Sequence, residues 1–202
     1  MRKIDSGLVR EAEAYVKKLL EERLPEAYLF HSWAHTFNVA NSSVIIGRFS
    51  GLNENDINKV QISALFHDAG YVSSGETHET DSALIAGEFL QANRVAGPDI
   101  EMVISAILAT RVPQQPTNAI SEVLCDADLM HLCGDDYFEQ MELLRLEWQR
   151  TGRYDLTEYQ FHMNSINFFN AHQYHSSYGK TVMTVKKAAN LLKIRQRAEF
   201  LL

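Results

Sequence analysis

The chain has 202 residues, of which 46% are hydrophobic and 22% are charged, and its formal net charge is −7. This length and composition are typical of one globular domain with a substantial core. The negative charge argues against an extended nucleic-acid surface or contact with an anionic membrane. It does not exclude a small phosphorylated ligand, because a bound metal ion can reverse the local field.

The termini and the cysteines predict a cytoplasmic protein. The charged N-terminus, Met1–Asp5, lacks the apolar segment of a signal peptide, and no apolar run approaches the length of a membrane span. Cys125 and Cys133 are the only cysteines, and their spacing fits neither a zinc knuckle nor a disulfide framework. The oligomeric state stays open.

The apolar residues recur at helical spacing along most of the chain, and only four prolines interrupt it. Pro25 ends the first helix, and the two prolines within 111–116 predict a loop. The predicted helices cover, in chain order, residues 5–23, 33–49, the stretch from the 51–56 turn to 68, 77–93, 97–109, 118–132, 135–151, 155–172 and 181–199. No strand alternation or internal repeat is visible. The expected fold is therefore all-α, with one domain over 1–202.

The pair His67-Asp68 lies inside the apolar run 62–71. Burying an ionised carboxylate is costly unless a cation or a hydrogen-bond network compensates it. A divalent metal ion is the most economical explanation, because imidazole nitrogen and carboxylate oxygen are common metal ligands.

Ligand-type residues occur in three further segments with similar apolar settings. They are His31 and His35, which share a helix face; His78 and Glu79, after a Ser/Gly break; and Asp126, Asp128 and His131. Each also has a structural interpretation, as a hydrogen-bonded core histidine, a helix cap or an ion-pair partner. We expect His162, His172 and His175 to lie on the surface or in loops.

Taken together, His35, His67-Asp68 and Asp128 resemble the H…HD…D signature of the HD superfamily of metal-dependent phosphohydrolases. The contexts are His-Thr-Phe-Asn-Val-Ala, Ala-Leu-Phe-His-Asp-Ala-Gly and Asp-Ala-Asp-Leu. The resemblance covers about residues 28–135, the helical core of that family. Residues 136–202 then form a helical C-terminal extension.

The resemblance implies that His35, His67, Asp68 and Asp128 bind one divalent ion, which in this family is Mn, Mg, Zn, Ni, Co or Fe. Asp128 is preferred over Asp126 because the family's last ligand usually follows a small residue, here Ala127. Asp126 stays open as the alternative. Residues 104–110 lack the histidine that two-metal members usually provide, which disfavours a dinuclear centre.

The implied activity is hydrolysis of a phosphate ester, in a nucleotide or cyclic nucleotide, by a metal-activated water. Asp68 would orient the nucleophile, while His78 or Glu79 would assist proton transfer. Arg111 and Lys180 are candidate cations for the phosphoryl group. Residues 170–180 form either a stacking wall for a base or a packing connection. The alternatives are a non-catalytic nucleotide sensor and an iron-dependent oxygenase of the same superfamily.

Overall fold

The computed structural model describes residues 1–201 and confirms the all-α prediction. The α-helices are α1 (Ser6–Arg23), α2 (Trp33–Phe49), α3 (Glu54–Phe66), α4 (His78–Ala92), α5 (Gly97–Leu108), α6 (Ala119–Asp128), α7 (Tyr137–Thr151), α8 (Glu158–Ala171) and α9 (Thr184–Glu199). Shorter helical turns are η1 (Ala69–Val72), η2 (Leu129–Cys133) and η3 (Gly179–Met183). The part of the chain that is described contains no strand, only an isolated bridge between Arg2 and Val95.

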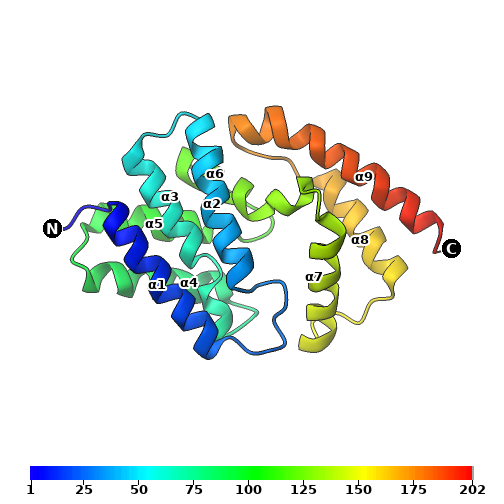
Figure 1. Cartoon of the computed structure of the whole chain (residues 1–202), viewed down its shortest axis with the longest axis horizontal. Helices are drawn as coiled ribbons and strands as arrows, with labels where there is room; N and C mark the ends of the chain where they lie inside the picture. The colour runs from blue at the N-terminus through cyan, green and yellow to red at the C-terminus, as the bar shows by residue number, and fades with distance from the viewer. Residues whose placement is uncertain (202) are drawn as a thin grey trace.

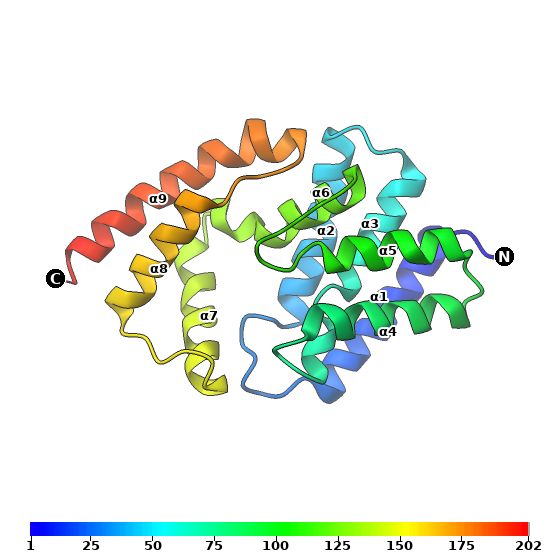
Figure 2. The same ribbon diagram turned by 180° about the vertical axis from the view of Figure 1, so that it is seen from behind.

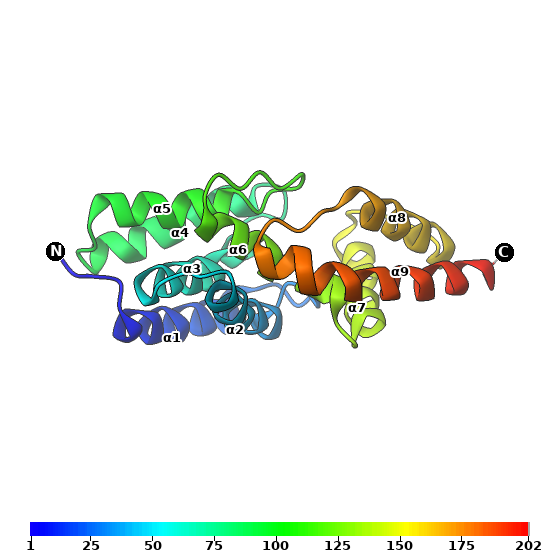
Figure 3. The ribbon, with the colours of Figure 1, turned by 90° about the horizontal axis from the view of Figure 1, so that it is seen from above.

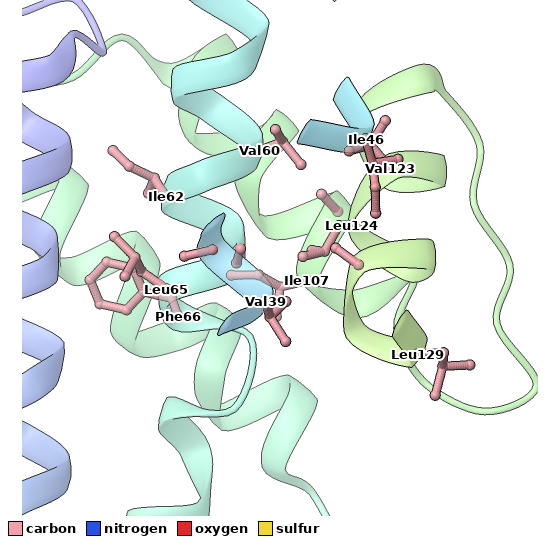
Figure 4. Packing of buried hydrophobic residues seen from close by; sticks show 14 of the residues in the cluster. Val39, Ile46, Val60, Ile62, Leu65, Phe66, Ile107, Val123, Leu124 and Leu129 are labelled. Carbon is pink, nitrogen blue, oxygen red and sulfur yellow. The ribbon is translucent and has the colours of Figure 1, made fainter. Parts of the chain in front are cut away.

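Helix α3 is the centre of the N-terminal half. It packs against α1, α2, α5 and α6, and Figure 3 shows α1 and α2 on one side of it with α4 and α5 on the other. Val60, Ile62, Leu65 and Phe66 are all buried at this centre (Figure 4). A helix covered on several faces must be apolar around most of its circumference, as the end of α3 is.

Helices α7, α8 and α9 form the other half of the molecule, as Figure 1 and the view from behind in Figure 2 show. Helix α8 packs against α9, and η2 contacts both α7 and α9. The short turn η2 therefore joins the two halves.

The predicted helix 118–132 is in fact interrupted. Helix α6 ends at Asp128, and the chain continues as the 3-10 turn η2. Helix α3 likewise ends at Phe66, and the turn η1 follows Asp68. His67, Asp68 and Asp128 thus all lie where a helix changes its winding.

Two glycines allow close approaches that position the site. A Cβ atom at Gly70 would collide with the carbonyl oxygen of His78, at the start of α4. A Cβ atom at Gly179 would collide with the carboxylate of Asp126. The predicted helix 181–199 begins with the π-helical turn η3 at this second contact, and Thr184 Oγ1 donates to the Gly179 carbonyl at 3.0 Å.

None of the described helices combines the length with the apolar character that crossing a bilayer requires.

Candidate metal centre

Three helices bring three ligand-type side chains together. His35 comes from α2, His67 from the end of α3 and Asp128 from the end of α6, and one ligand atom of each lies within 4.8 Å of the others. Asp128 Oδ1 is 3.5 Å from Nε2 of both histidines. The cluster is the one that the sequence pattern predicts, and two of its members are buried.

Asp68 adds a second carboxylate to the cluster. Its Oδ2 lies 3.1 Å from His67 Nε2 and 3.4 Å from His35 Nε2, yet this buried oxygen has no hydrogen-bond partner. His67 Nδ1 bonds the Ala64 carbonyl at 2.7 Å, which assigns its proton to Nδ1 in the neutral ring. The Nε2 lone pair then faces a carboxylate oxygen. Only a positive charge between them relieves that contact, so the donor set fits a metal cation.

The electrostatics of the cluster support the same conclusion. Burial disfavours the charged form of His67, but Asp68 and Asp128 outweigh it and raise its pKa well above the usual value. Burial also works against the Asp68 anion, and the charge of His67 nevertheless keeps the pKa of Asp68 far below its normal range. In the metal-free protein a proton supplies the positive charge that these carboxylates require.

The structure places His78 and Glu79 beside the cluster. His78 Nε2 lies 3.8 Å from Asp68 Oδ1 and 3.6 Å from Glu79 Oε1, and its ring stacks on Tyr71. Arg111 does not line the cavity described below. Its Nε is 3.6 Å from Glu79 Oε2, and a guanidinium nitrogen donates to Thr80 Oγ1 at 3.0 Å.

Asp126 does not join the cluster. Its buried carboxylate accepts hydrogen bonds from the His175 backbone N–H at 2.8 Å, the Ser176 backbone N–H at 2.9 Å and the Ser176 hydroxyl at 2.6 Å. Asp126 therefore holds the connection between α8 and α9. The structure brings Asp128, rather than Asp126, to the two histidines.

The hypothesis that residues 170–180 wall the site is wrong for the described structure. Tyr178 packs against Phe49, and the Tyr174 hydroxyl donates to the Leu129 carbonyl at 3.1 Å. Lys180 is exposed, and no residue of this segment lines the cavity described below. The segment is the packing connection of the alternative interpretation.

The prediction that His162 lies on the surface or in a loop is also wrong. His162 is buried within α8, where its ring lies near Phe138 and Phe161. Its Nε2 is 3.5 Å from Glu158 Oε1, one helical turn away. The amphipathic spacing of α8 explains this burial, because position 162 follows the buried Phe161 on the inner face.

Sequence reasoning missed the contacts made by Glu147 of α7. This carboxylate is 2% exposed and accepts hydrogen bonds from the backbone N–H groups of Phe30 and His31, at 2.9 and 3.0 Å. It also forms a short hydrogen bond with His31 Nδ1, and His31 Nε2 lies 3.3 Å from the Tyr71 hydroxyl. A glutamate within a charged helical stretch carries no local sign of such a role.

His131 is a second residue without an assigned role in the sequence pattern. Burial and the charge of His35 lower its pKa to about 4, so the ring is neutral at pH 7. Its Nδ1 lies 3.2 Å from the Asp128 carbonyl, in the turn η2. It therefore presents a neutral imidazole beside the cluster.

A cavity of about 510 Å³ extends from this cluster toward the C-terminal helices. Its lining includes Asp68, Glu79 and Asp128 together with aromatic and apolar side chains of α7 and α8. This volume suits a small organic molecule. The helices of the C-terminal extension therefore help to enclose the site.

The HD domain family matches residues 32–132, half of the chain and the stretch that carries all four predicted ligands. The chain belongs to the HD domain family. No curated protein gives a significant match.

A crystal structure of a Lactobacillus plantarum protein, solved as a structural genomics target, is similar over the full length of both molecules. It covers 98% of this chain and 99% of its own chain with a TM-score of 0.70, at 18% identity. This likeness shows that α7, α8 and α9 belong to a fold that the second protein shares.

The two neighbouring aspartates provide a matched test of the metal site. Asp128→Asn removes a charged ligand, so we expect divalent-metal affinity to fall by more than about 100-fold, above the usual effect of an outer-shell change. Asp126→Asn should retain metal affinity but lose about 1–3 kcal/mol of unfolding free energy, because an amide NH₂ replaces one of the two oxygens that accept from His175 and Ser176. Metal titration and urea denaturation measure the two effects. Equal metal affinities for the two variants would contradict the assignment.

The Glu147–His31 contact predicts a pH-dependent stability. Burial opposes the charge on His31, but the hydrogen bond to Glu147 and the charge of Asp68 raise its pKa above the usual value. The stabilisation is therefore complete below the unfolded-state pKa of about 6.5 and is lost as pH rises through the folded-state pKa. Glu147→Gln should lower the unfolding free energy more at pH 6 than at pH 9, measured with a chelator present. A difference independent of pH would contradict this coupling.

Proposed function

We propose that this protein is a metal-dependent phosphohydrolase that cleaves the phosphate ester of a small nucleotide or cyclic nucleotide. The observation that carries the proposal is the cluster of three buried side chains, His35, His67 and Asp68, and the half-buried Asp128, next to a cavity of about 510 Å³. Membership of the HD domain family supports the same class of reaction.

His35, His67, Asp68 and Asp128 would hold one divalent ion. The ligand types suit a borderline transition metal better than Ca²⁺, because two of the four are imidazoles. When bound, such an ion supplies positive charge that stabilises phosphoryl oxygens and acidifies a nearby water.

His78 and Glu79 are the proposed proton carriers. His78 Nε2 faces the cavity between Asp68 Oδ1 and Glu79 Oε1, at 3.8 and 3.6 Å. In this position Nε2 can carry a proton to a leaving oxygen in the cavity. Stacking on Tyr71 fixes the plane of the ring, with the ring centres 4.1 Å apart.

Arg153 replaces Arg111 and Lys180 as the proposed cation for the phosphoryl group. Among the described residues that line the cavity, Arg153 is the one arginine or lysine. It follows Gly152, which ends α7 in the left-handed conformation and turns the chain back toward the cavity. A guanidinium can bond two phosphate oxygens at once.

Metal binding should release protons. Because Asp68 and Asp128 keep His67 protonated in the metal-free protein near pH 7, a divalent ion must displace that proton. The apparent affinity should therefore rise by about tenfold per pH unit below the raised pKa of His67, for each proton released. Calorimetric titration of Mn²⁺ in two buffers with different ionisation enthalpies counts the protons. A count of zero at pH 6 would contradict the assignment of His67.

The activity is tested on protein loaded in turn with Mn²⁺, Mg²⁺, Zn²⁺, Ni²⁺, Co²⁺ and Fe²⁺. Nucleoside mono-, di- and triphosphates and cyclic nucleotides serve as substrates, and released phosphate or nucleoside is measured. We expect turnover with at least one ion and a loss of more than about 100-fold in kcat for Asp68→Ala, because this removes both a ligand and an orienting carboxylate. Asp126→Asn is the control.

Two results would overturn the proposal. Bound metal without turnover of any phosphate ester would leave a sensor as the better interpretation. Oxygen uptake by the iron-loaded protein, without phosphate-ester hydrolysis, would instead indicate an oxygenase.

A further inference from the structure

The cavity contains two polar atoms that the fold leaves without partners. The Tyr137 hydroxyl and the Trp148 indole Nε1 are both buried and make no hydrogen bond, and both side chains line the cavity. Tyr137 as a whole is 1% exposed. A buried donor without an acceptor costs about 1–3 kcal/mol, so two of them in one cavity need a reason.

Neighbouring side chains do not supply that reason. The Ser165 hydroxyl, which also lines the cavity, donates to the Phe161 carbonyl at 2.9 Å and forms no hydrogen bond with the Tyr137 hydroxyl. Burial raises the pKa of Tyr137, and nearby Ser165 opposes this only in part, so the phenol stays protonated. Two side chains that line this part of the cavity therefore each have a buried donor without an acceptor.

The surrounding wall is aromatic. The ring of Trp148 lies with its centre 4.8 Å from that of Tyr154 and 5.5 Å from that of Phe161, both in edge arrangements. Phe168 of α8 completes the group, and Met141 lies beside it in the lining. We call Tyr137, Met141, Trp148, Phe161 and Phe168 the aromatic chamber. Helices α7 and α8 build all of it, outside the residues 32–132 that match the HD domain.

We propose that the aromatic chamber binds a planar heteroaromatic ring carried by the leaving group of the substrate, and that this ring accepts hydrogen bonds from Tyr137 Oη and Trp148 Nε1. A nucleobase has this chemistry, with aromatic faces for the wall and nitrogen or oxygen acceptors on its edge. Tyr137 and Trp148 are thus the specificity-determining residues. The inference rests on the proposed phosphohydrolase function, because it places this ring on a phosphate ester.

The charges of the lining indicate how many phosphates the ester carries. Asp68, Glu79 and Asp128 are acidic, whereas Arg153 is the one arginine or lysine on the described lining. One divalent ion and Arg153 together balance the three carboxylates. A phosphate monoester adds two negative charges, whereas a triphosphate adds about four and finds no second arginine or lysine on the described lining. The preferred substrate is therefore a nucleoside monophosphate.

Binding to the aromatic chamber can be measured without any reaction. The chain has two tryptophans, so in the variant Trp33→Phe the indole of Trp148 is the only one left. Adenosine, guanosine, cytidine and thymidine carry no phosphate, and at least one of them should quench this fluorescence saturably, whereas ribose should not. Introducing Tyr137→Phe into this variant should weaken the binding by about threefold to tenfold, the effect of one lost hydrogen bond.

Kinetics test the same residues on whole substrates. Trp148→Phe keeps an aromatic ring but loses the N–H, and Tyr137→Phe loses only the hydroxyl. Each should raise KM for a nucleoside 5′-monophosphate by about threefold to tenfold. Each should also lower, by a similar factor, the ratio of kcat/KM for the nucleotide to kcat/KM for ribose 5-phosphate, which has no base. Trp33→Phe and Tyr159→Phe are the matched controls, because neither residue lines the cavity.

The possible outcomes separate the two proposals. Hydrolysis of phosphate esters without nucleoside binding would overturn the aromatic chamber and leave the phosphohydrolase intact. Nucleoside binding without hydrolysis of any ester would overturn the phosphohydrolase alone. Equal losses on ribose 5-phosphate and nucleoside monophosphates would also overturn the chamber, because they indicate a general disturbance. A preference for triphosphates over monophosphates would overturn the charge argument.

Discussion

The rest of the site depends on one electrostatic constraint, the close approach of the buried Asp68 and the half-buried Asp128 to the Nε2 atoms of two buried histidines. Asp68 Oδ2 faces His67 and His35 at 3.1 and 3.4 Å without a hydrogen bond. Such a cluster is stable only with added positive charge, from a proton or from a metal ion. Because α3 and α6 both end at this point, the ligands lie at the ends of packed helices. The free energy of packing α3 against its neighbours offsets the electrostatic cost of holding the ligands there.

Two parts of the chain line the cavity with different kinds of side chain. The part that matches the HD domain supplies the charged cluster, whereas α7 and α8 supply the aromatic wall and Arg153. Glu147 connects them, because its buried carboxylate bonds the backbone of Phe30 and His31 just before α2. A shift of α7 would therefore move both the wall and the segment that leads to His35. This contact links the aromatic chamber with the segment before the His35 cluster.

Asp126 and Asp128 show how closely structural and chemical roles can lie in sequence. Two residues along a helix differ in direction by about 200°, so their side chains point to nearly opposite sides. Asp128 faces His35 and His67, while Asp126 faces the α8–α9 connection and bonds Ser176. Gly179 packs against Asp126 where no side chain would fit. The same short helix thereby carries Asp128, a predicted metal ligand, and Asp126, whose hydrogen bonds hold the connection between α8 and α9.

The sequence by itself determined the all-α fold, the approximate helix boundaries and the His35, His67-Asp68 and Asp128 pattern. Helical periodicity is a local property, since it is written in neighbouring residues. The ligand pattern joins three distant segments, and its resemblance to the HD superfamily made it visible. Only the tertiary structure decided that Asp126 bonds the α8–α9 connection, that His162 is buried and that residues 170–180 lie away from the cavity. It also brought Glu147, Tyr137 and Trp148 to the site, from a helix that begins four residues after η2. Contacts between distant helices leave no periodic signal, because the partner that satisfies a buried polar atom can lie anywhere along the chain.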